Sequence, residues 1–480
     1  MNIKTNFGLI LLTILSTNLF AQSWDNMQSG VTGHTLPNGA LPSINDIICY
    51  QGRIIACGTF LNAGGISTNN IASWNGNNWD SLGIGLYSSF YHNADTKCLH
   101  IKEYKSKLYG CGWFDGAGGS SFYDTAHVVI GISKWDGTDF YPLLPHGNYY
   151  TGLGNTPVTM TEYKNKLYIG GGFNSFWLPS NGGHLARGIV RWDDTTFSNC
   201  GYFDSNGSDF IATSSIVYNN KLIEAGEFNS INGSPYGMYG YIGAYNDTIW
   251  STLSVGLNAP VFALSVFNGD LYAGGVFTAT GDGLTLLNHI AKWDGIQWSA
   301  VGEGLNDTVL TLTVDSAQSK LVAGGLFTQT GLGITAKHLA EWNGTNWQEL
   351  GGGVNGPVTA LLAKDSNLYV GGLFNQIGGT TAANNIACWG PSHVGVDDIS
   401  ASSTTMQLEI YPNPSNGEFT IESTSKIESI KVFNILGETI YQTAKDNLQA
   451  TINLSSQPKG IYFVQVKTEK GILNRKIVIQ

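Results

Sequence analysis

Charged side chains are scarce in this sequence. Only 12% of its 480 residues are Asp, Glu, Lys or Arg, about half of the share in average soluble proteins. So low a share argues against a disordered chain and against a helical bundle. The net charge is −11. Because a negative field repels phosphate backbones, the sequence also argues against DNA or RNA as a partner.

Long apolar runs are missing as well. The apolar stretch 7–20 is too short to span a bilayer, which takes about 20 residues. With Lys4 before it and Ala21 after it, the stretch has the pattern of an export signal peptide. Gln22 rather than a cysteine follows, which disfavours a lipid-modified amino terminus. We expect residues 1–21 to be removed, and a mature protein without a transmembrane segment that is secreted or attached to the outer-membrane surface.

Cysteine motifs are absent. The six cysteines include no Cys-x-x-Cys and no His/Cys cluster with zinc spacing. Most of them lie in strand-like runs, so we expect small buried apolar side chains and no metal or other cofactor. Cys98 and Cys111 fall on adjacent strands of one expected hairpin and form the pair to test first for a disulfide.

Glycine and aromatic residues are abundant instead, with 62 Gly, 13 Trp, 22 Tyr and 21 Phe. The segment 271–277, Leu-Tyr-Ala-Gly-Gly-Val-Phe, is one of seven related copies about 50 residues apart. Each copy is followed by an Ile-Ala-Lys-Trp-like run, and in six of the copies a second aromatic lies five residues further on. The copies end at Phe60, Phe114, Phe173, Phe228, Phe277, Phe327 and Phe374.

Each copy predicts four short strands. In the fifth copy, Asn268-Gly269 and Asp294-Gly295 supply the hairpin turns. The paired glycines are expected to let an aromatic side chain of the neighbouring sheet approach the backbone. Phosphate binding by them is disfavoured because no helix follows. Seven four-stranded sheets predict an all-β fold with a seven-bladed β-propeller at residues 22–390; an open β-solenoid is the alternative.

The seventh copy ends without its fourth strand, and the missing piece stands at the start of the mature chain. Trp24, Met27, Gly30 and Val31 match the fourth-strand residues Trp298, Val301, Gly304 and Leu305. We therefore expect the N-terminal strand to complete the last blade and close the ring, which would cover two sheet edges. A solenoid has no use for such a permutation.

The Gly-Gly and Trp spacing of this region resembles kelch-like propellers. It is more similar still to the Gly-Gly-x-Phe and Ile-Ala-x-Trp repeats of fungal cortical cell-polarity markers and of many exported Bacteroidetes proteins. The kelch pattern places a tyrosine between the glycine pair and one tryptophan, which this sequence lacks. The resemblance therefore implies a propeller and no particular propeller enzyme.

A second domain follows. Residues 391–407 are small and polar, as in a linker, and residues 405–480 carry eight Lys/Arg against seven Asp/Glu. Seven short strands are expected in a small Ig-like β-sandwich at residues 408–480. Their expected ranges are 408–411, 418–422, 429–434, 439–442, 450–454, 460–467 and 472–479.

This C-terminal domain resembles the type A sorting domain of the type IX secretion system. The resemblance is carried by the segments 410–417 (Ile-Tyr-Pro-Asn-Pro-Ser-Asn-Gly), 432–437, 460–466 and 476–480. It implies passage through the outer membrane, the secretion machinery as a partner, and Bacteroidetes as the source. The residues that carry the sorting signal are expected to be Pro412, Asn413, Pro414, Gly417, Gly437, Gly460, Tyr462 and Lys476.

A ligand site is expected where the propeller's variable connections gather, on one face and near units two to four. Trp177 is the single tryptophan without a place in the repeat, and a loop tryptophan among tyrosines can stack on a sugar or anchor a protein. It can equally cap a small core under a long loop. The expected ligand-binding residues are Trp177, Tyr149, Tyr150, Tyr123, Phe176 and His184.

No catalytic constellation is evident. The histidines are scattered, and Glu224 and Glu227 point to opposite faces of one strand. The favoured hypothesis is a non-catalytic surface propeller that binds a glycan or a protein. A polysaccharide- or glycoside-acting enzyme, which needs two facing carboxylates, and a purely structural surface protein are the alternatives.

Overall fold

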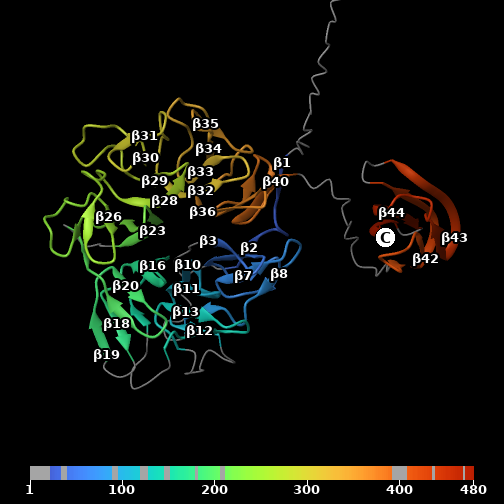
Figure 1. Ribbon diagram of the computed structural model, residues 1–480, viewed down its shortest axis with the longest axis horizontal. Helices are drawn as coiled ribbons and strands as arrows, with labels where there is room; N and C mark the ends of the chain where they lie inside the picture. Colours follow the sequence, from blue (N-terminus) through green and yellow to red (C-terminus); the bar gives the residue numbers. More distant parts are fainter. Residues whose placement is uncertain are drawn as a thin grey trace, which may run out of the picture. The chain divides into compact units, whose positions relative to one another are not determined.

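The computed structural model describes residues 22–33, 41–88, 96–118, 128–144, 152–178, 182–205, 211–391, 408–434, 438–468 and 471–480. All regular elements in these ranges are β-strands, and none of the ranges contains a helix fit to cross a membrane. The chain forms two compact units, residues 21–391 and a C-terminal unit described from Leu408 onward (Figure 1). The expected signal peptide 1–21 lies outside the described residues, as does the expected linker apart from Pro391.

The larger unit contains seven antiparallel four-stranded sheets, numbered here in chain order as sheets 1 to 7. Sheet 1 has β3 (Ser43–Tyr50), β4 (Arg53–Thr59), β7 (Ile71–Trp74) and β8 (Trp79–Ser81). Sheet 2 has β10 (Lys97–Tyr104), β11 (Lys107–Trp113), β13 (Ile132–Trp135) and β14 (Phe140–Tyr141). Sheet 3 has β16 (Pro157–Tyr163), β17 (Lys166–Gly171), β20 (Ile189–Trp192) and β21 (Phe197–Asn199). Sheet 4 has β23 (Ala212–Tyr218), β24 (Lys221–Gly226), β26 (Ile242–Tyr245) and β27 (Trp250–Thr252).

The remaining three sheets continue the series. Sheet 5 has β28 (Val261–Phe267), β29 (Asp270–Gly275), β30 (Ile290–Trp293) and β31 (Trp298–Ala300). Sheet 6 has β32 (Val309–Asp315), β33 (Lys320–Gly325), β34 (Leu339–Trp342) and β35 (Trp347–Glu349). Sheet 7 has β36 (Val358–Lys364), β37 (Asn367–Gly372), β40 (Ile386–Pro391) and β1 (Gln22–Asp25).

The sheets follow one another around a centre. The first strand of each sheet packs against the first strand of the next, and β36 of sheet 7 packs against β3 of sheet 1. Figure 1 shows these first strands grouped around the middle of the unit, and the later strands lie further out. The arrangement is all-β and propeller-like.

Sheet 7 is assembled from both ends of the unit. β1 pairs with β40 so that Trp24 lies opposite Trp389, with ring centroids 5.2 Å apart. Met27 and Val31 are fully buried. At Gly30, where φ is +69°, a Cβ atom would lie 2.1 Å from the Asn384 carbonyl oxygen. The N-terminal segment is therefore packed tightly against sheet 7.

Each sheet stacks an aromatic ring of its third strand on one of its fourth strand. The seven pairs are Trp74–Trp79, Trp135–Phe140, Trp192–Phe197, Tyr245–Trp250, Trp293–Trp298, Trp342–Trp347 and Trp389–Trp24. Such pairs add about 0.5–1.5 kcal/mol beyond the area they bury.

Five of the fourth-strand aromatics also bind the preceding sheet. In each of them the tryptophan Nε1–H donates to a backbone carbonyl that follows the fourth strand of that sheet, at 2.6–3.1 Å. The bonds are Trp24 to Gly351, Trp79 to Met27, Trp250 to Cys200, Trp298 to Leu253 and Trp347 to Val301. Sheets 2 and 3 carry Phe140 and Phe197 at this position, which have no N–H to donate.

The paired glycines bring neighbouring sheets together, but the approaching side chain is not the aromatic expected from the sequence. A Cβ at Gly274 would lie 2.5 Å from Val309, and one at Gly324 would lie 2.4 Å from Val358. Both valines begin the first strand of the next sheet. The missing Cβ atoms therefore let the first strands near the ring's centre pack closely.

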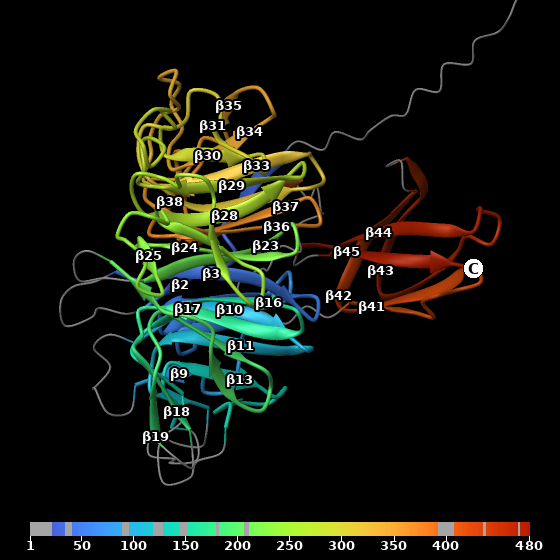
Figure 2. The same cartoon turned by 60° about the vertical axis from the view of Figure 1, so that its left-hand side comes forward.

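Five small sheets lie in the second-to-third connections and in the links between sheets; this side of the ring is called the loop face. The opposite side, which carries the tight hairpin turns, is called the turn face. The small sheets contain β2 (Val31–Thr32), β5 (Asn62–Ala63), β6 (Ile66–Ser67), β9 (Leu86–Tyr87), β12 (Gly116–Ala117), β15 (Gly152–Gly154), β18 (Ser175–Leu178), β19 (Gly182–Leu185), β22 (Phe203–Asp204), β25 (Ser230–Ile231), β38 (Gln376–Ile377) and β39 (Thr381–Ala382). Figure 2 shows β18, β19, β25 and β38 on the same side of the unit.

The described residues of the C-terminal unit form five strands where seven were predicted. They are β41 (Leu408–Tyr411), β42 (Glu418–Phe433), β43 (Thr439–Asn453), β44 (Gly460–Thr468) and β45 (Gly471–Ile479). Each predicted range falls in a strand, but two pairs are continuous because the ladder between β42 and β43 runs on through irregular positions. Their alternating side chains bury Phe419, Ile421, Ile430 and Val432 in one core.

We expect Trp24→Ala to lower the free energy of unfolding by about 3 kcal/mol, because it removes a partly buried ring and the indole bond to Gly351. Trp24→Phe removes the indole N–H and keeps a ring, as in sheets 2 and 3, and should cost about 1 kcal/mol. Urea unfolding of the mature chain measures both, with Trp298→Phe as the matched variant inside the chain. An unchanged midpoint for Trp24→Ala would contradict the role of β1.

Candidate functional site

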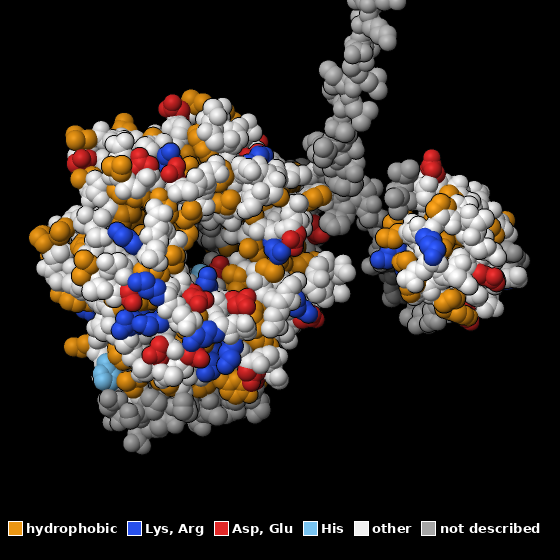
Figure 3. All heavy atoms as spheres, in the orientation of Figure 1, with side chains coloured by type: hydrophobic (Ala, Val, Ile, Leu, Met, Phe, Trp, Pro, Cys, Tyr) orange, Lys and Arg blue, Asp and Glu red, His pale blue; other side chains and the backbone are white. Residues whose placement is uncertain are grey.

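A cavity of about 370 Å³ lies where the seven first strands meet, and Figure 3 shows the unit hollowed at its centre. All seven sheets contribute to its wall. The lining residues are Asn45, Asp46, Leu99, His100, Val158, Thr159, Thr213, Ser214, Ser215, Phe262, Ala263, Leu264, Leu310, Thr311, Leu312 and Thr359.

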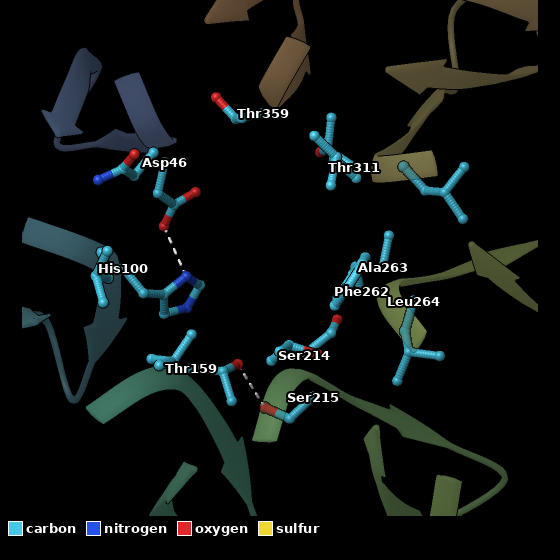
Figure 4. A pocket seen from close by; sticks show the side chains of 16 residues that line it. Asp46, His100, Thr159, Ser214, Ser215, Phe262, Ala263, Leu264, Thr311 and Thr359 are labelled. Atoms are coloured by element: carbon cyan, nitrogen blue, oxygen red, sulfur yellow. Dashed lines mark hydrogen bonds and ion pairs between the residues drawn. The ribbon is translucent and has the colours of Figure 1, made fainter. Parts of the chain in front are cut away.

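The wall is divided by polarity. Sheets 5 and 6 contribute mainly apolar side chains, including Phe262 and Leu312, whereas Asp46, His100 and Ser215 come from sheets 1, 2 and 4. Figure 4 shows the labelled acid and imidazole on one side and Phe262 and Leu264 on the other. The cavity thus combines one polar and one apolar side.

Asp46 and His100 form an acid–imidazole pair in the cavity, with Oδ2 of Asp46 2.8 Å from Nδ1 of His100. The backbone N–H groups of Ile47 and Ile101 also donate to the carboxylate. Burial acts to raise the pKa of Asp46, but the His100 charge and these hydrogen bonds outweigh it and hold that pKa below its usual value. Nε2 of His100 lies 3.3 Å from the Met160 carbonyl. The pair therefore links sheets 1, 2 and 3.

Hydroxyl groups continue this linkage from sheet 3 to sheet 4. The Ser215 and Thr161 hydroxyls lie 2.7 Å apart, and Thr159 Oγ1 lies 3.1 Å from Ser215 Oγ. Thr161 also donates to the Ser215 carbonyl at 2.9 Å. These polar side chains are hydrogen-bonded to one another, so they hold the first strands together as well as lining the cavity.

Glu224 is a buried carboxyl group that sequence reasoning treated only as an unconvincing acid. Its side chain is fully buried, and neither oxygen has a hydrogen-bond partner within the described residues. It faces sheet 3, where a Cβ on Gly170 would lie 3.1 Å from Oε2. Burial raises its pKa well above the usual value. The other six repeats carry Ala56, Gly110, Ile169, Ala273, Ala323 and Val370 at this position, so alignment of the repeats is the signal that could have found it.

Trp177 lies on the middle strand of the small sheet β15-β18-β19. It faces a glycine on each neighbouring strand, Gly152 and Gly183. A Cβ on Gly183 would lie 3.4 Å from three atoms of the indole ring, so the ring lies across the sheet at this position. The side chain is partly exposed. Trp177 is thus a planar apolar surface on the loop face.

The other expected ligand residues lie elsewhere. Phe176 is buried in the core of sheet 3 and stacks on His184, with ring centroids 5.1 Å apart. Nε2 of His184 is buried without a hydrogen-bond partner in the described part of the chain. Tyr123, Tyr149 and Tyr150 lie outside the described residues. Phe176 and His184 therefore lie on the core side of the β18–β19 hairpin, and Trp177 does not.

The cysteines are all free thiols, so the expected test pair Cys98 and Cys111 forms no disulfide in this structure. In the register of β10 and β11, Cys98 lies opposite Gly112 and Cys111 lies opposite His100. Burial raises the pKa of Cys57 and of Cys111 well above the usual value. No group of three or more His, Cys, Asp or Glu side chains is placed to hold a metal ion in the ranges that the structure describes.

In the C-terminal unit, the proline-containing turn binds the last strand. The Asn413 side chain donates to the Lys476 carbonyl at 2.8 Å and accepts the Val478 N–H at 3.0 Å. Gly417 has φ +103°, where a Cβ would lie 2.5 Å from Ser455. Pro412, Pro414 and Lys476 are exposed, Gly460 begins β44, and the Tyr462 hydroxyl donates to Pro458. Gly437 lies outside the described residues.

Residues 409–480 match the family described as the secretion system C-terminal sorting domain. The C-terminal unit is a sorting domain of the type IX secretion system. This domain indicates export and a cell-surface or secreted location, and it implies interaction with the secretion machinery. No curated protein matches the chain.

Several solved structures resemble the chain at low identity. PorZ, a surface component of the type-IX secretion system of Porphyromonas gingivalis, is 12% identical with a TM-score of 0.40; 91% of this chain and 59% of PorZ are covered. The extracellular domain of BT4673 from B. thetaiotaomicron is 15% identical with a TM-score of 0.46, covering 96% and 58%. A puromycin-hydrolyzing peptidase of Mycobacterium tuberculosis is 12% identical with a TM-score of 0.44, covering 83% and 61%. The chain spans less than two thirds of each, and at these scores none carries a functional argument.

We expect Glu224→Gln to raise stability at neutral pH. The folded-state pKa of this carboxyl is raised, so the unfolded chain releases its proton first and wild-type stability falls as pH rises above about 4.5. The glutamine variant has no proton to release and so lacks this loss. Urea unfolding of both proteins between pH 4 and pH 8 measures the difference. A difference independent of pH would contradict the buried, unpartnered carboxyl.

Proposed function

We propose that the protein is an exported surface protein whose residues 22–390 form a seven-bladed β-propeller that binds a glycan or a protein without catalysis. The seven four-stranded sheets packed in a closed order support the propeller, and the pairing of β1 with β40 supports closure by Trp24, Met27, Gly30 and Val31. The sorting domain supplies the export route.

The observation that carries the binding role is Trp177. Its ring lies across Gly183 on the loop face and is partly exposed. Tryptophan offers a large rigid surface at little cost in conformational entropy, which suits it to stack on a sugar ring or anchor a partner. The same packing also fills space above a glycine, so the ring serves the hairpin as well as a ligand.

The acid–imidazole pair in the central cavity supports binding over catalysis. Asp46 is the single carboxylate among the residues that line the described cavity, and it accepts bonds from His100 and from two backbone N–H groups. Glycoside hydrolysis uses two carboxyl groups on either side of the bond to be broken. The Asp46 carboxylate therefore already takes part in the hydrogen bonds that join sheets 1 and 2.

A glycan array probed with the mature chain tests the binding role. We expect Trp177→Ala to weaken binding of the retained glycan at least tenfold, because the ring surface is lost, and Trp177→Phe to weaken it less. Trp113→Ala is the control, since Trp113 is also exposed but belongs to sheet 2. Binding unchanged by Trp177→Ala, or cleavage of the bound glycan, would overturn the proposal.

Deletion of residues 408–480 tests the export route. We expect the truncated chain to accumulate in the periplasm, because it lacks the sorting domain that the secretion machinery recognises. The full chain should reach the surface or the medium. Protease accessibility on intact cells distinguishes the two locations. Asn413→Ala, which removes both bonds to β45, should reduce export in proportion to the loss of the folded domain. Normal surface display of the truncated chain would contradict this route.

A further inference from the structure

Two lysines of sheet 2 occupy positions where other sheets carry an ion pair. The positions are the first residue of the second strand and the third residue of the third strand. In sheet 5 they hold Asp270 and Lys292, 3.1 Å apart. In sheet 6 they hold Lys320 and Glu341, 2.6 Å apart. Sheet 2 has Lys107 and Lys134 at these positions, so two ammonium groups stand where sheets 5 and 6 have opposite charges; sheet 3 likewise has two cations, Lys166 and Arg191.

The described residues do not neutralise these two lysines directly, since neither forms an ion pair with a described carboxylate. Lys134 Nζ donates to the Leu143 carbonyl at 3.3 Å, which engages one of its three N–H groups. Burial and then the charge of Lys107 lower the pKa of Lys134, and the charge of Asp194 offsets part of this. Repulsion between the two ammonium groups therefore contributes to the lowered pKa of Lys134.

The two lysines line a cavity of about 240 Å³ on the turn face, together with Trp135, Asp136 and Tyr141, and the wall of this cavity is almost entirely apolar. Trp135 packs on Phe140, with ring centroids 5.0 Å apart, and Tyr141 is exposed. Oδ1 of Asp136 accepts the backbone N–H groups of its own turn. Figure 3 shows Lys and Arg side chains over the region of β11, β13, β16 and β20, interspersed with Asp and Glu side chains.

We propose that this cavity binds one acidic sugar residue of a polysaccharide, with its anionic group between Lys107 and Lys134 and its ring against Trp135 and Tyr141. The two ammonium groups supply the charge complement. The aromatic side chains supply planar apolar walls. The volume is below the range of drug-sized sites, which suits a single ring. An acidic peptide would use the two charges but not the aromatic walls.

This site is separate from the proposed Trp177 site. Trp177 lies on the loop face of sheet 3, whereas Lys107 and Asp136 stand beside the hairpin turns of sheet 2. The inference therefore goes beyond the proposed function, and Trp177→Ala should leave acidic-sugar binding unchanged. The two proposals can fail independently.

Titration calorimetry of the mature chain with trigalacturonate tests the site, with a sulfated oligosaccharide as the second anionic probe and a neutral oligosaccharide as the control ligand. We expect at least tenfold weaker binding of the neutral probe. Lys107→Asp copies the pair of sheet 5 and should weaken acidic-sugar binding at least tenfold while keeping the fold, because Lys134 then has an internal partner. Lys221→Asp makes the same charge change at the same position of sheet 4 and should leave binding unchanged.

Three results would overturn the site. They are no binding of either anionic probe at millimolar concentration, equal binding by the Lys107→Asp and wild-type proteins, and polyglutamate binding as tight as that of the sugars. The last would indicate an acidic peptide as the ligand. Tyr141→Ser gives a second readout that leaves both lysines in place, and it should weaken the sugar without changing the salt dependence of binding. If this variant binds the sugar as tightly as the wild-type protein, the Tyr141 ring does not contact the ligand.

Discussion

The indole hydrogen bond from the outer strand of one sheet to the sheet before it is the contact on which the ring depends. One such bond contributes only about 1 kcal/mol, but it adds a directional contact between the outer strands of neighbouring sheets. The N-terminal segment takes part in two of these bonds. Trp24 donates to Gly351 of sheet 6, and the Met27 carbonyl accepts the indole of Trp79 in sheet 1. The segment 22–31 thus binds both neighbours of the last sheet.

Polar side chains near the centre connect the sheets at the two junctions that lack the indole bond, as they also do between sheets 3 and 4. Phe140 and Phe197 leave sheets 2 and 3 without an N–H at the outer strand. At the same two junctions, Asp46 binds His100 and His100 contacts the Met160 carbonyl. The polar side of the cavity therefore has a structural cause. It cannot be assigned to a ligand merely because it is polar and central.

The repeat predicted the strands and the partner of β1, because tryptophan spacing and paired glycines are local features. It could not predict Lys107 beside Lys134, since that contact depends on which residues of two strands face each other. The continuity of strands β42 and β43 was missed because the polar residues at 423–428 and 443–449 have the composition of turns. In the structure these residues remain in the strands, and the β42–β43 ladder passes them with shifts of register. Phe176 and Trp177 looked alike in sequence, yet alternation along β18 sends one into the core and the other to the loop face.

Departures from the repeat are concentrated in sheets 2 to 4. These sheets contain the two missing indole bonds, the two lysines of like charge, the buried Glu224 and the hairpin of Trp177. Sheets 5 and 6, in contrast, have the ion pair and the tryptophan at every equivalent position. A repeat that only had to close a ring would have no reason to vary in adjacent units. Sequences depart from local structural rules most often at functional sites. Sheets 2 to 4, which are the least regular, are therefore the place to look for ligands. The two positions are Trp177 on the loop face and Lys107 with Lys134 on the turn face.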